Sequence, residues 1–453
     1  MRSTRPSALL ALLLAAAAPL GAQEAPPPGE PLSLDQALRT AAENNPQYRR
    51  VLTEIGTAEA DVRRSRGAFL PQVNLRLGAS GNYSRVFTGQ GEFGQPVVRQ
   101  DPLDLKSSFA QQSLSVGSFT LFDAGQRQRE LRAARTGFAA TEARVGAEEV
   151  RVRADVTRRY WEAVRTDRAI RLEEALLASA QDRLEVTRAL VRVGVRGPLD
   201  VLGAEVTVAE QEQALERARG DARKAQLDLR QAMGVLEGGW LRLTDEPVQP
   251  FDPTALDGEG VVRGALAAHP RIARVALVEQ QAGHRVQAAR ATRWPRLSVG
   301  ASVGRSQRFS DFAGLVEPSP LDQSLGLNID LSFPLFNGYQ TSYQIQAARA
   351  GQAAAREDVR AERLALERDV RGALVDLENA FRTFRNAERT LGLNRQRLQL
   401  AQEQYRVGAL TLNDLTDAVE RAARAERDVL RTRFEFATAL ATLEERAGTP
   451  VRP

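Results

Sequence analysis

The sequence YRVGALTLNDLTD at residues 405–417 decides how the rest of the chain is arranged. A helical pattern without proline precedes it over residues 340–407, and another follows it over residues 412–447. Gly408 suits the position just beyond the first helix, where a left-handed backbone favours glycine. Thr411 has the side chain of an N-terminal cap, with an acidic residue three positions later. The stretch therefore predicts the tip of a long helical hairpin.

A second version of this turn lies in the first half of the chain, over residues 191–202. Gly408 and Gly194 differ by 214 positions, and Asp414 and Asp200 differ by the same number. A proline also stands near the start of the helix that follows the first turn, where its missing N–H group costs nothing. Two hairpin tips at a constant offset indicate an internal duplication of the chain.

The composition of the 453 residues excludes several classes of protein. The formal net charge of +5 is small for this length and is spread along helices, so nucleic-acid binding is not expected. The absence of cysteine excludes disulfides, thiolate metal sites and a lipid anchor on cysteine. The only two histidines, His269 and His284, have no acidic cluster around them, so we expect neither a metal nor a cofactor. No motif of an enzyme nucleophile or a phosphate-binding loop is present, and we expect no enzyme.

Residues 1–22 have the features of a secretory signal peptide. Arg2 and Arg5 precede an apolar run over residues 8–18, and a small-residue cleavage site follows. The run is too short to be a spanning helix, and the sequence contains no other long apolar run. We therefore expect an exported protein, and its lack of disulfides points to a bacterial envelope.

Two pairs of strands are predicted from alternating apolar and polar residues. The first pair covers residues 72–85 and 111–122, approximately, and the second covers 296–308 and 323–336. The alternation slips out of phase before Phe119, which indicates a β-bulge or a strand that leaves the sheet. Each pattern has about the length that a tilted transmembrane strand requires.

Long helical patterns surround these strands. In the first half they cover residues 126–193 and 198–233, and at about 1.5 Å per residue the longer one would span roughly 100 Å. A shorter pattern over 33–67 is interrupted at Pro46, and its counterpart in the second half is interrupted at Pro270. Leucines at seven-residue intervals predict coiled-coil-like packing between the long helices.

Each half therefore consists of a helix, a strand, a loop, a strand, a long helix, a turn and a shorter helix. We predict an α+β membrane protein with a first repeat over residues 23–235, a link over 236–257 and a second repeat over 258–450. Four strands cannot close a barrel and open strand edges cannot lie in lipid, so transmembrane strands would require oligomerisation. Three copies would supply about 12 strands, within the known range of barrels.

This layout resembles that of TolC-type outer membrane efflux proteins over nearly the whole chain after residue 22. The resemblance rests on the duplicated order of elements, the paired strands, the sequences FTLFDAG at 119–125 and FPLFNG at 333–338, and the two Arg-Val-Gly tips. It implies a homotrimer in the bacterial outer membrane, in contact with lipid, with one β-barrel and a periplasmic α-barrel of helices. It also implies a passive exit duct of a tripartite efflux or type I secretion system, which an inner-membrane transporter and a periplasmic adaptor protein supply with substrate.

The resemblance also assigns roles to residues at the two tips. It implies adaptor contacts at Arg192, Val193, Gly194, Arg406, Val407, Gly408 and Leu410. It implies a constricted entrance at Asp414, Asp417 and Asp200. Like charges from three copies would stand close together there, and raised pKa values or bound cations would relieve their repulsion. The simpler alternative is that Asp414 stabilises a helix N-terminus and that Asp417 is a solvated helix residue.

The main alternative is a periplasmic coiled-coil adaptor or scaffold protein without a membrane barrel. Such proteins also contain long helical hairpins, but usually one, and two pairs of strands suited to lipid favour the channel. A secreted enzyme on a helical scaffold is disfavoured because the sequence contains no recognisable catalytic site.

Overall fold

The computed structural model describes residues 31–82, 107–235, 237, 239–309, 323–407 and 409–451. The predicted signal peptide at residues 1–22 lies outside the described residues. So do Gly408 and residues 83–85 at the end of the first predicted strand.

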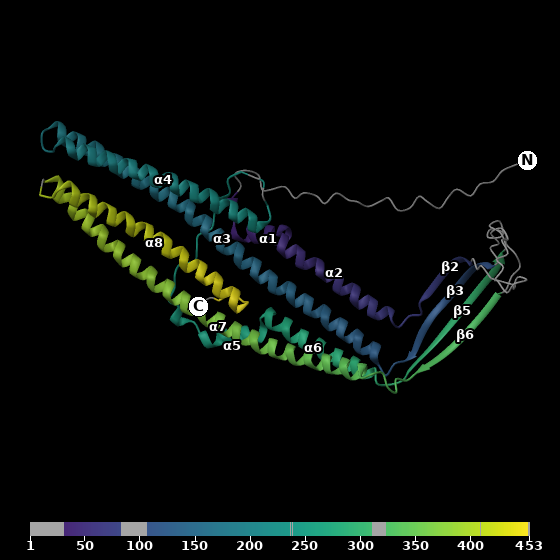
Figure 1. Cartoon of the computed structure of the whole chain (residues 1–453). Coiled ribbons are helices and arrows are strands. Elements are labelled where there is room, and N and C mark those ends of the chain that lie inside the picture. The colour runs from purple at the N-terminus through teal and green to yellow at the C-terminus, as the bar shows by residue number, and fades with distance from the viewer. Residues whose placement is uncertain are drawn as a thin grey trace, which may run out of the picture. The chain divides into compact units, whose positions relative to one another are not determined.

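Helices account for most of the described chain, and Figure 1 shows them with their labels. In chain order the elements are β1 (Pro31–Leu32), α1 (Leu34–Asn44), α2 (Pro46–Gly67), β2 (Val73–Asn82), β3 (Ser107–Phe122), α3 (Gln126–Arg192), α4 (Pro198–Met233), β4 (Arg242–Leu243), the short 3-10 helix η1 (Pro253–Ala255), α5 (Gly258–Ala268), α6 (Pro270–Ala291), β5 (Arg296–Phe309), β6 (Gln323–Ser332), α7 (Gln340–Arg406) and α8 (Leu412–Ala447).

The long helices confirm the duplication that the sequence predicts. Helices α3 and α7 have 67 residues each, and α4 and α8 have 36 residues each. The first residues of α3 and α7 differ by 214 positions, as do those of α4 and α8. In the described part of the chain, no helix combines the length and the apolar character needed to cross a membrane.

The chain divides into two compact units, and both halves of the sequence contribute to each. Unit 1 comprises Met1–Pro46, Val152–Phe251 and Ala380–Ala441, and it contains both hairpin tips. Unit 2 comprises Gln47–Arg151, Asp252–Asn379 and Thr442–Pro453, and it contains the four long strands. Because α3 and α7 contribute residues to both units, the boundary between units does not follow the boundary between repeats.

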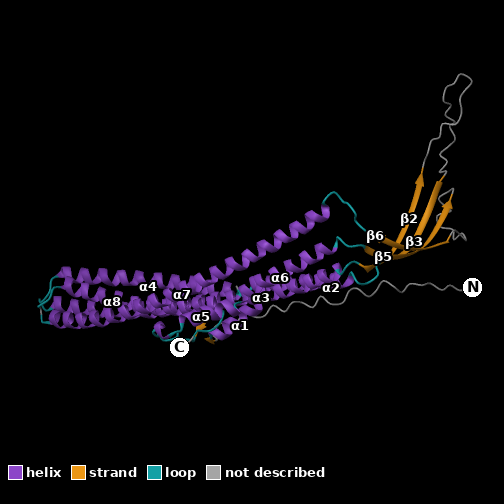
Figure 2. Ribbon diagram, turned by 90° about the horizontal axis from the view of Figure 1, so that it is seen from below, coloured by secondary structure: helices purple, strands orange, loops and turns teal. Residues whose placement is uncertain are grey.

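The four long strands of unit 2 form one antiparallel sheet in the order β2-β3-β5-β6 (Figure 2). The register between β3 and β5 shifts between Val116 and Phe119, which confirms the predicted bulge. Apolar side chains along β6 are strongly exposed, from 83% for Leu325 to 68% for Leu331. Strands β2 and β6 are the edges of this sheet, so one chain leaves two edges for pairing.

The predicted end of the last strand is wrong. Strand β6 ends at Ser332, four residues before the expected end at 336. Pro334 follows closely, and proline has no N–H group to donate to a strand ladder. Strand β3 begins at Ser107, earlier than expected, because it pairs with β2 as far as Asn82.

Part of the segment between the repeats makes fixed contacts within unit 1. Strand β4 pairs in parallel with β1, and the ring of Phe251 meets Phe436 edge-on at 5.4 Å between centroids. The fully buried Tyr160 donates its hydroxyl proton to the Leu32 carbonyl at 2.9 Å. Burial raises the pKa of Tyr160 to about 12. These contacts join residues more than a hundred positions apart, and the sequence pattern did not predict them.

Candidate functional site

The first hairpin tip is closed by a glycine in the left-handed conformation. Gly194 has a φ of 78°, and the N–H group of Val195 donates to the Leu190 carbonyl at 3.0 Å. This is the hydrogen bond of a Schellman motif, which satisfies a carbonyl at the end of α3. Helix α4 then begins at Pro198, as predicted, where an N–H group would have no helical partner.

The second tip makes the same bond 214 residues later. The N–H group of Ala409 donates to the Gln404 carbonyl at 2.9 Å, while Gly408 itself lies outside the described residues. The N–H group of Asp414 donates to the Thr411 hydroxyl at 3.3 Å, and that hydroxyl donates to the Asp414 carboxylate at 2.6 Å. The predicted helix cap at Thr411 is therefore confirmed, and the Asp414 side chain is part of it.

Side chains at the apex of each turn are exposed. Val193 is 71% exposed and Val407 is 79% exposed, and the neighbouring Arg192 and Arg406 are exposed as well. Leu199 adds a further exposed apolar side chain to the first tip. A cluster of exposed apolar side chains beside arginines is typical of a surface that binds another protein.

Leu410 is placed differently from the other residues that the resemblance assigned to adaptor contact. It is partly buried, and it packs against a cluster formed by Ala401, Tyr405, Leu415 and Ala418. Helices α7 and α8 are therefore fixed to one another at the second tip by apolar contacts, to which Leu410 contributes.

Arg196 joins the first tip to the second, and the sequence analysis did not identify it. Its guanidinium lies 4.2 Å from the centre of the Tyr405 ring and donates to the Leu410 carbonyl at 3.1 Å. A weaker bond reaches the Tyr405 carbonyl at 3.4 Å. The available signal was a break in the repeat, because 214 positions after this arginine stands Leu410.

Removing this arginine is expected to loosen the second tip. Arg196→Ala loses a stacked cation and two carbonyl contacts, together worth about 1–3 kcal/mol of local stability. Hydrogen exchange at residues 404–411 should accelerate accordingly. Arg192→Ala removes an exposed arginine of the same tip and should leave that exchange unchanged. Equal exchange in the wild type and Arg196→Ala would contradict the role of Arg196 in holding the tips together.

The acids of the second tip are engaged within the chain. Asp417 accepts from Arg421 at 2.9 Å and from Arg397 at 2.8 Å. The bonds from Arg421 and then the charge of Arg397 hold the pKa of Asp417 below its ordinary value. Asp414 is exposed, and Asp200 is half-buried in the first turn of α4. Asp417 is therefore a paired carboxylate within one chain, which differs from a free solvated residue.

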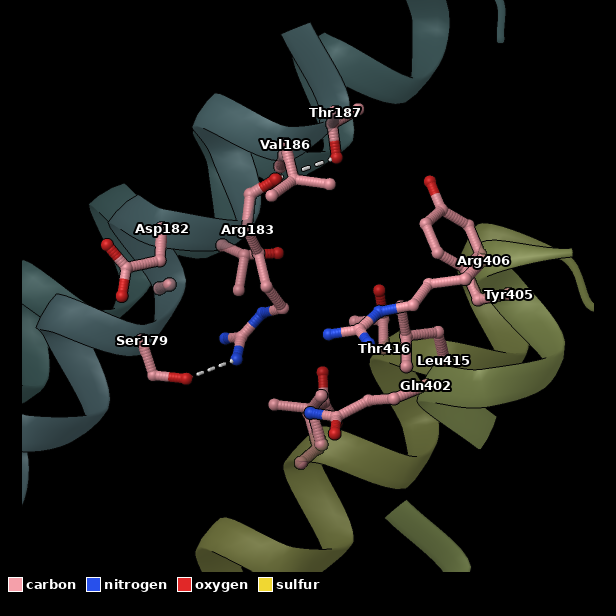
Figure 3. Close-up of a pocket in the computed structure, with 15 residues that line it drawn as sticks. Ser179, Asp182, Arg183, Val186, Thr187, Gln402, Tyr405, Arg406, Leu415 and Thr416 are labelled. Carbon is pink, nitrogen blue, oxygen red and sulfur yellow. Dashed lines mark hydrogen bonds between the residues drawn. The ribbon is translucent and has the colours of Figure 1, made fainter. Parts of the chain in front are cut away.

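A pocket of about 270 Å³ lies between the two hairpins near their tips. Arg183 of α3 and Arg406 of α7 extend into the same space (Figure 3), together with Gln402 and the apolar side chains of Val186 and Leu415. Burial lowers the pKa of Arg183, whose guanidinium donates to a serine hydroxyl one turn away at 2.8 Å. The pocket thus presents both cationic and apolar groups.

An ion pair in the same unit links three helices. Glu173 of α3 is 6% exposed, and Arg427 of α8 donates to both of its carboxylate oxygens at 2.6 and 2.7 Å. Gln211 of α4 donates to the same carboxylate. Burial raises the pKa of Glu173, but the hydrogen bonds and charge of Arg427 outweigh this effect and lower it. The pair fixes the relative positions of the two hairpins within unit 1.

Among the residues that the structure describes, no group of three or more histidine or acidic side chains is placed to hold a metal ion. A duplicated pair of long hairpins, joined to a sheet with an exposed apolar face and two open edges, defines an outer membrane channel.

The comparison with known families gives the same result. The family model "Outer membrane efflux protein" matches residues 37–235 and 261–449, and the chain belongs to this family. It is 29% identical over 341 residues to "Protein CyaE" of Bordetella pertussis, covering 74% of this chain and 67% of the relative. It is 24% identical to "Outer membrane protein TolC" of Vibrio cholerae, covering 92% of this chain and 91% of that protein.

A solved structure shows the same fold. The crystal structure of CusC, described in connection with transmembrane channel formation, aligns with a TM-score of 0.76 at 18% sequence identity. The alignment covers 92% of each chain. The resemblance to TolC-type proteins and the predicted combination of α-barrel and β-barrel are thus confirmed.

The family consists of channel proteins. The chain is an outer membrane efflux or secretion channel with a large periplasmic part, and the comparisons favour this over the alternative of a periplasmic adaptor without a barrel.

Proposed function

We propose that three copies of this chain form the passive exit duct of a tripartite efflux or type I secretion system. Its substrates arrive from an inner-membrane transporter through a periplasmic adaptor protein. The sheet carries this proposal, because its two edge strands and exposed apolar side chains are incomplete in a single chain. Pairing of β2 with β6 of the next copy would close a barrel of about 12 strands.

The two repeats that build each subunit span residues 23–235 and 258–450, with a link over 236–257 between them. The two separate ranges matched by the family model support this division, as does the constant offset between equivalent helices. The link contains the short elements β4 and η1, and β4 pairs with β1 within unit 1.

The adaptor contacts the hairpin tips. Exposed Val193 and Val407, together with Arg192 and Arg406, offer apolar surface and positive charge at the turns. Gly194 allows the chain to turn at the first tip, and Leu410 acts by packing under the second turn. Gly408, at the equivalent position of the second tip, lies outside the described residues. The pocket near Arg183 extends the same surface away from the turns.

Acidic side chains constrict the entrance of the duct. Asp414 and Asp417 lie in the first two turns of α8, and Asp200 lies in the equivalent first turn of α4. Copies of these carboxylates around a shared axis would attract cations and slow anions. Arg397 and Arg421 partly neutralise the negative charge of Asp417. Asp414 therefore contributes more of the negative potential at the entrance.

Single-channel conductance in planar bilayers tests this proposal. We expect the wild-type protein to form stable, cation-preferring pores. The double variant Asp414→Ala/Asp417→Ala should lower the ratio of cation to anion permeability by about threefold or more. Asp358→Ala, which removes an exposed acid of α7 far along the chain from the tips, serves as the control.

The outcomes separate the parts of the proposal. If the double variant forms pores with unchanged ion selectivity, the protein is a channel but the acidic side chains do not form its constriction. A folded oligomer that does not insert into lipid at all would overturn the exit duct.

A further inference from the structure

Each half of the chain contains a break between two short helices, and both breaks precede a proline. Asn45 is the residue between the helices at the first break and His269 is the residue at the second, and the two positions differ by 224. Asn45 donates from Nδ2 to the Ala232 carbonyl at 2.8 Å, in the last turn of α4. His269 binds the Glu445 carbonyl through Nε2 at 3.1 Å, in the last turn of α8. The two breaks therefore hold the ends of equivalent helices.

A left-handed glycine completes each of these contacts. Gly234 follows α4 with a φ of 77°, and Gly448 follows α8 with a φ of 74°. A Cβ atom on the first would lie 2.3 Å from the Asn44 carbonyl oxygen, and one on the second 2.9 Å from the His269 ring. We call these contacts the Asn45 joint (Asn45, Ala232, Gly234) and the His269 joint (His269, Glu445, Gly448).

Both ring nitrogens of His269 are in use at its joint. The N–H group of Arg271 donates to Nδ1 at 3.1 Å, so the ring proton lies on Nε2 and is donated to the Glu445 carbonyl. The side chain is 3% exposed. A second proton on Nδ1 would face an N–H group and lose the bond that caps α6. The joint as built therefore requires a neutral ring.

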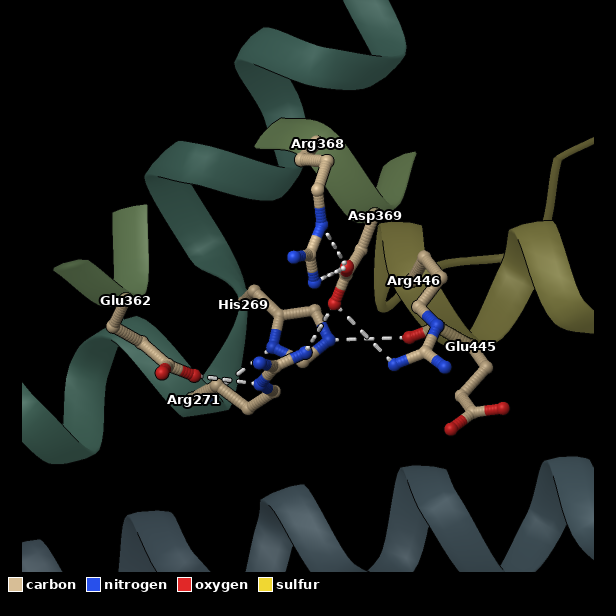
Figure 4. Close-up of polar contacts among 7 residues, drawn as sticks. All are labelled: His269, Arg271, Glu362, Arg368, Asp369, Glu445 and Arg446. Carbon is tan, nitrogen blue, oxygen red and sulfur yellow. Dashed lines mark hydrogen bonds and ion pairs between the residues drawn. The ribbon is translucent and has the colours of Figure 1, made fainter. Parts of the chain in front are cut away.

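Charged groups on α6, α7 and α8 lie around this ring (Figure 4). Arg271 of α6 pairs with Glu362 at 2.6 Å and with Asp369 of α7 at 3.3 Å. Asp369 also pairs with Arg368 at 2.6 Å and with Arg446 of α8 at 3.6 Å. A pocket of about 300 Å³ beside the ring adds Arg274, Glu445, and Arg144, Glu148 and Arg151 of α3.

Glu362, Asp369 and Glu148 near His269 are thus engaged by arginines, and the charges of Glu362 and Glu445 do not outweigh burial of the ring. Arg144 pairs with Glu54 at 2.6 Å, and Arg151 pairs with Glu148 at 3.4 Å. Burial lowers the pKa of His269, and the charge of Arg271 acts in the same direction.

We propose that the His269 joint is an acid-sensitive attachment of the end of α8, and that the Asn45 joint is its acid-insensitive counterpart on α4. Opening exposes the imidazole to water, where its ordinary pKa is about 6.5. The open form therefore takes up a proton more readily than the closed one. The stabilisation is complete above that pH and is lost as the pH falls below it. An asparagine has no proton to gain, so acid loosens the return helix of the second tip only.

Hydrogen exchange of the full-length protein in detergent at pH 7.5 and 5.5 tests this proposal, after correction for the intrinsic exchange rates. We expect the opening constant at residues 269–274 and 442–448 to rise by up to about tenfold per pH unit below 6.5. Residues 45–50 and 230–235 should show no such rise. His269→Asn copies the other joint and should abolish the response. His284→Asn, which changes the only other histidine, should leave it intact.

The reciprocal variant Asn45→His should create the same pH response at residues 45–50 and 230–235. The Asn45→His variant also tests the proposal if His269→Asn does not fold. Absence of the pH response in Asn45→His would then overturn the proposal. An equal rise at both wild-type joints, or a response that survives in folded His269→Asn, would overturn it as well.

Discussion

Gly234→Ala is expected to lower the free energy of unfolding by about 2–5 kcal/mol. The residue has a φ of 77°, a conformation that costs a residue with a Cβ atom about 1–2 kcal/mol. The new Cβ would also lie 2.3 Å from the carbonyl oxygen of Asn44 and 2.5 Å from its carbon. These are backbone atoms at the end of α1, so a helix must shift, which adds about 1–3 kcal/mol.

Gly194→Ala is the matched control for this variant. Its φ of 78° is nearly the same, but its Cβ would meet no atom within 4 Å. It should therefore lose only the conformational part, about 1–2 kcal/mol. Urea unfolding followed by the helical circular-dichroism signal measures both variants. If the two lose the same stability, the close approach of α4 to the end of α1 does not restrict this position.

Arg427→Ala is expected to lower the free energy of unfolding by about 3 kcal/mol at neutral pH. The substitution leaves the carboxylate of Glu173 buried without its cation, with Gln211 as its remaining partner. In the wild type the folded-state pKa of Glu173 is lowered, so the pair stabilises the fold above the unfolded value of about 4.3 and loses this effect on acidification.

In the variant, burial raises the pKa of Glu173 and only the hydrogen bond from Gln211 opposes it, so the variant regains stability as the pH falls. The difference between wild type and Arg427→Ala should therefore shrink on acidification, which urea unfolding at several pH values measures. Arg431→Ala, in an exposed pair on the same helix, should lose at most about 1 kcal/mol. Restoration of stability in Glu173→Leu/Arg427→Leu would support the desolvation argument. A pH-independent loss in Arg427→Ala would contradict it.

Local sequence signals predicted the long helices and the four long strands. Helix α8 begins at Leu412 because Thr411 caps it, and α4 begins at Pro198 because proline is favoured in a first turn. Alternation predicted the strands, and the phase slip before Phe119 predicted the bulge. Strand β6 ends before the alternation of apolar residues does, because Pro334 has no N–H group to donate to the strand ladder.

The tip site was predicted only in part. The turns and caps followed from glycine, threonine and proline, whose effects act within a few residues. The pairing of Asp417 with Arg397 across the hairpin was not foreseen, because interleaved charges on a helix do not show which partners they select. Arg196 was overlooked because it differs from Leu410 at the equivalent position of the other repeat.

The sequence by itself determined the duplicated order of helices and strands and the positions of both tips, since periodicity, capping and turn residues are local properties. The class of channel came from the resemblance of this layout to a known family. The tertiary structure alone decided which side chains join helices that are distant in the sequence. Arg427 meets Glu173 across 254 positions, Arg196 meets the Leu410 carbonyl across 214, and His269 meets the Glu445 carbonyl across 176. Such contacts depend on which helix faces are buried against each other, and packing of the whole unit sets those faces.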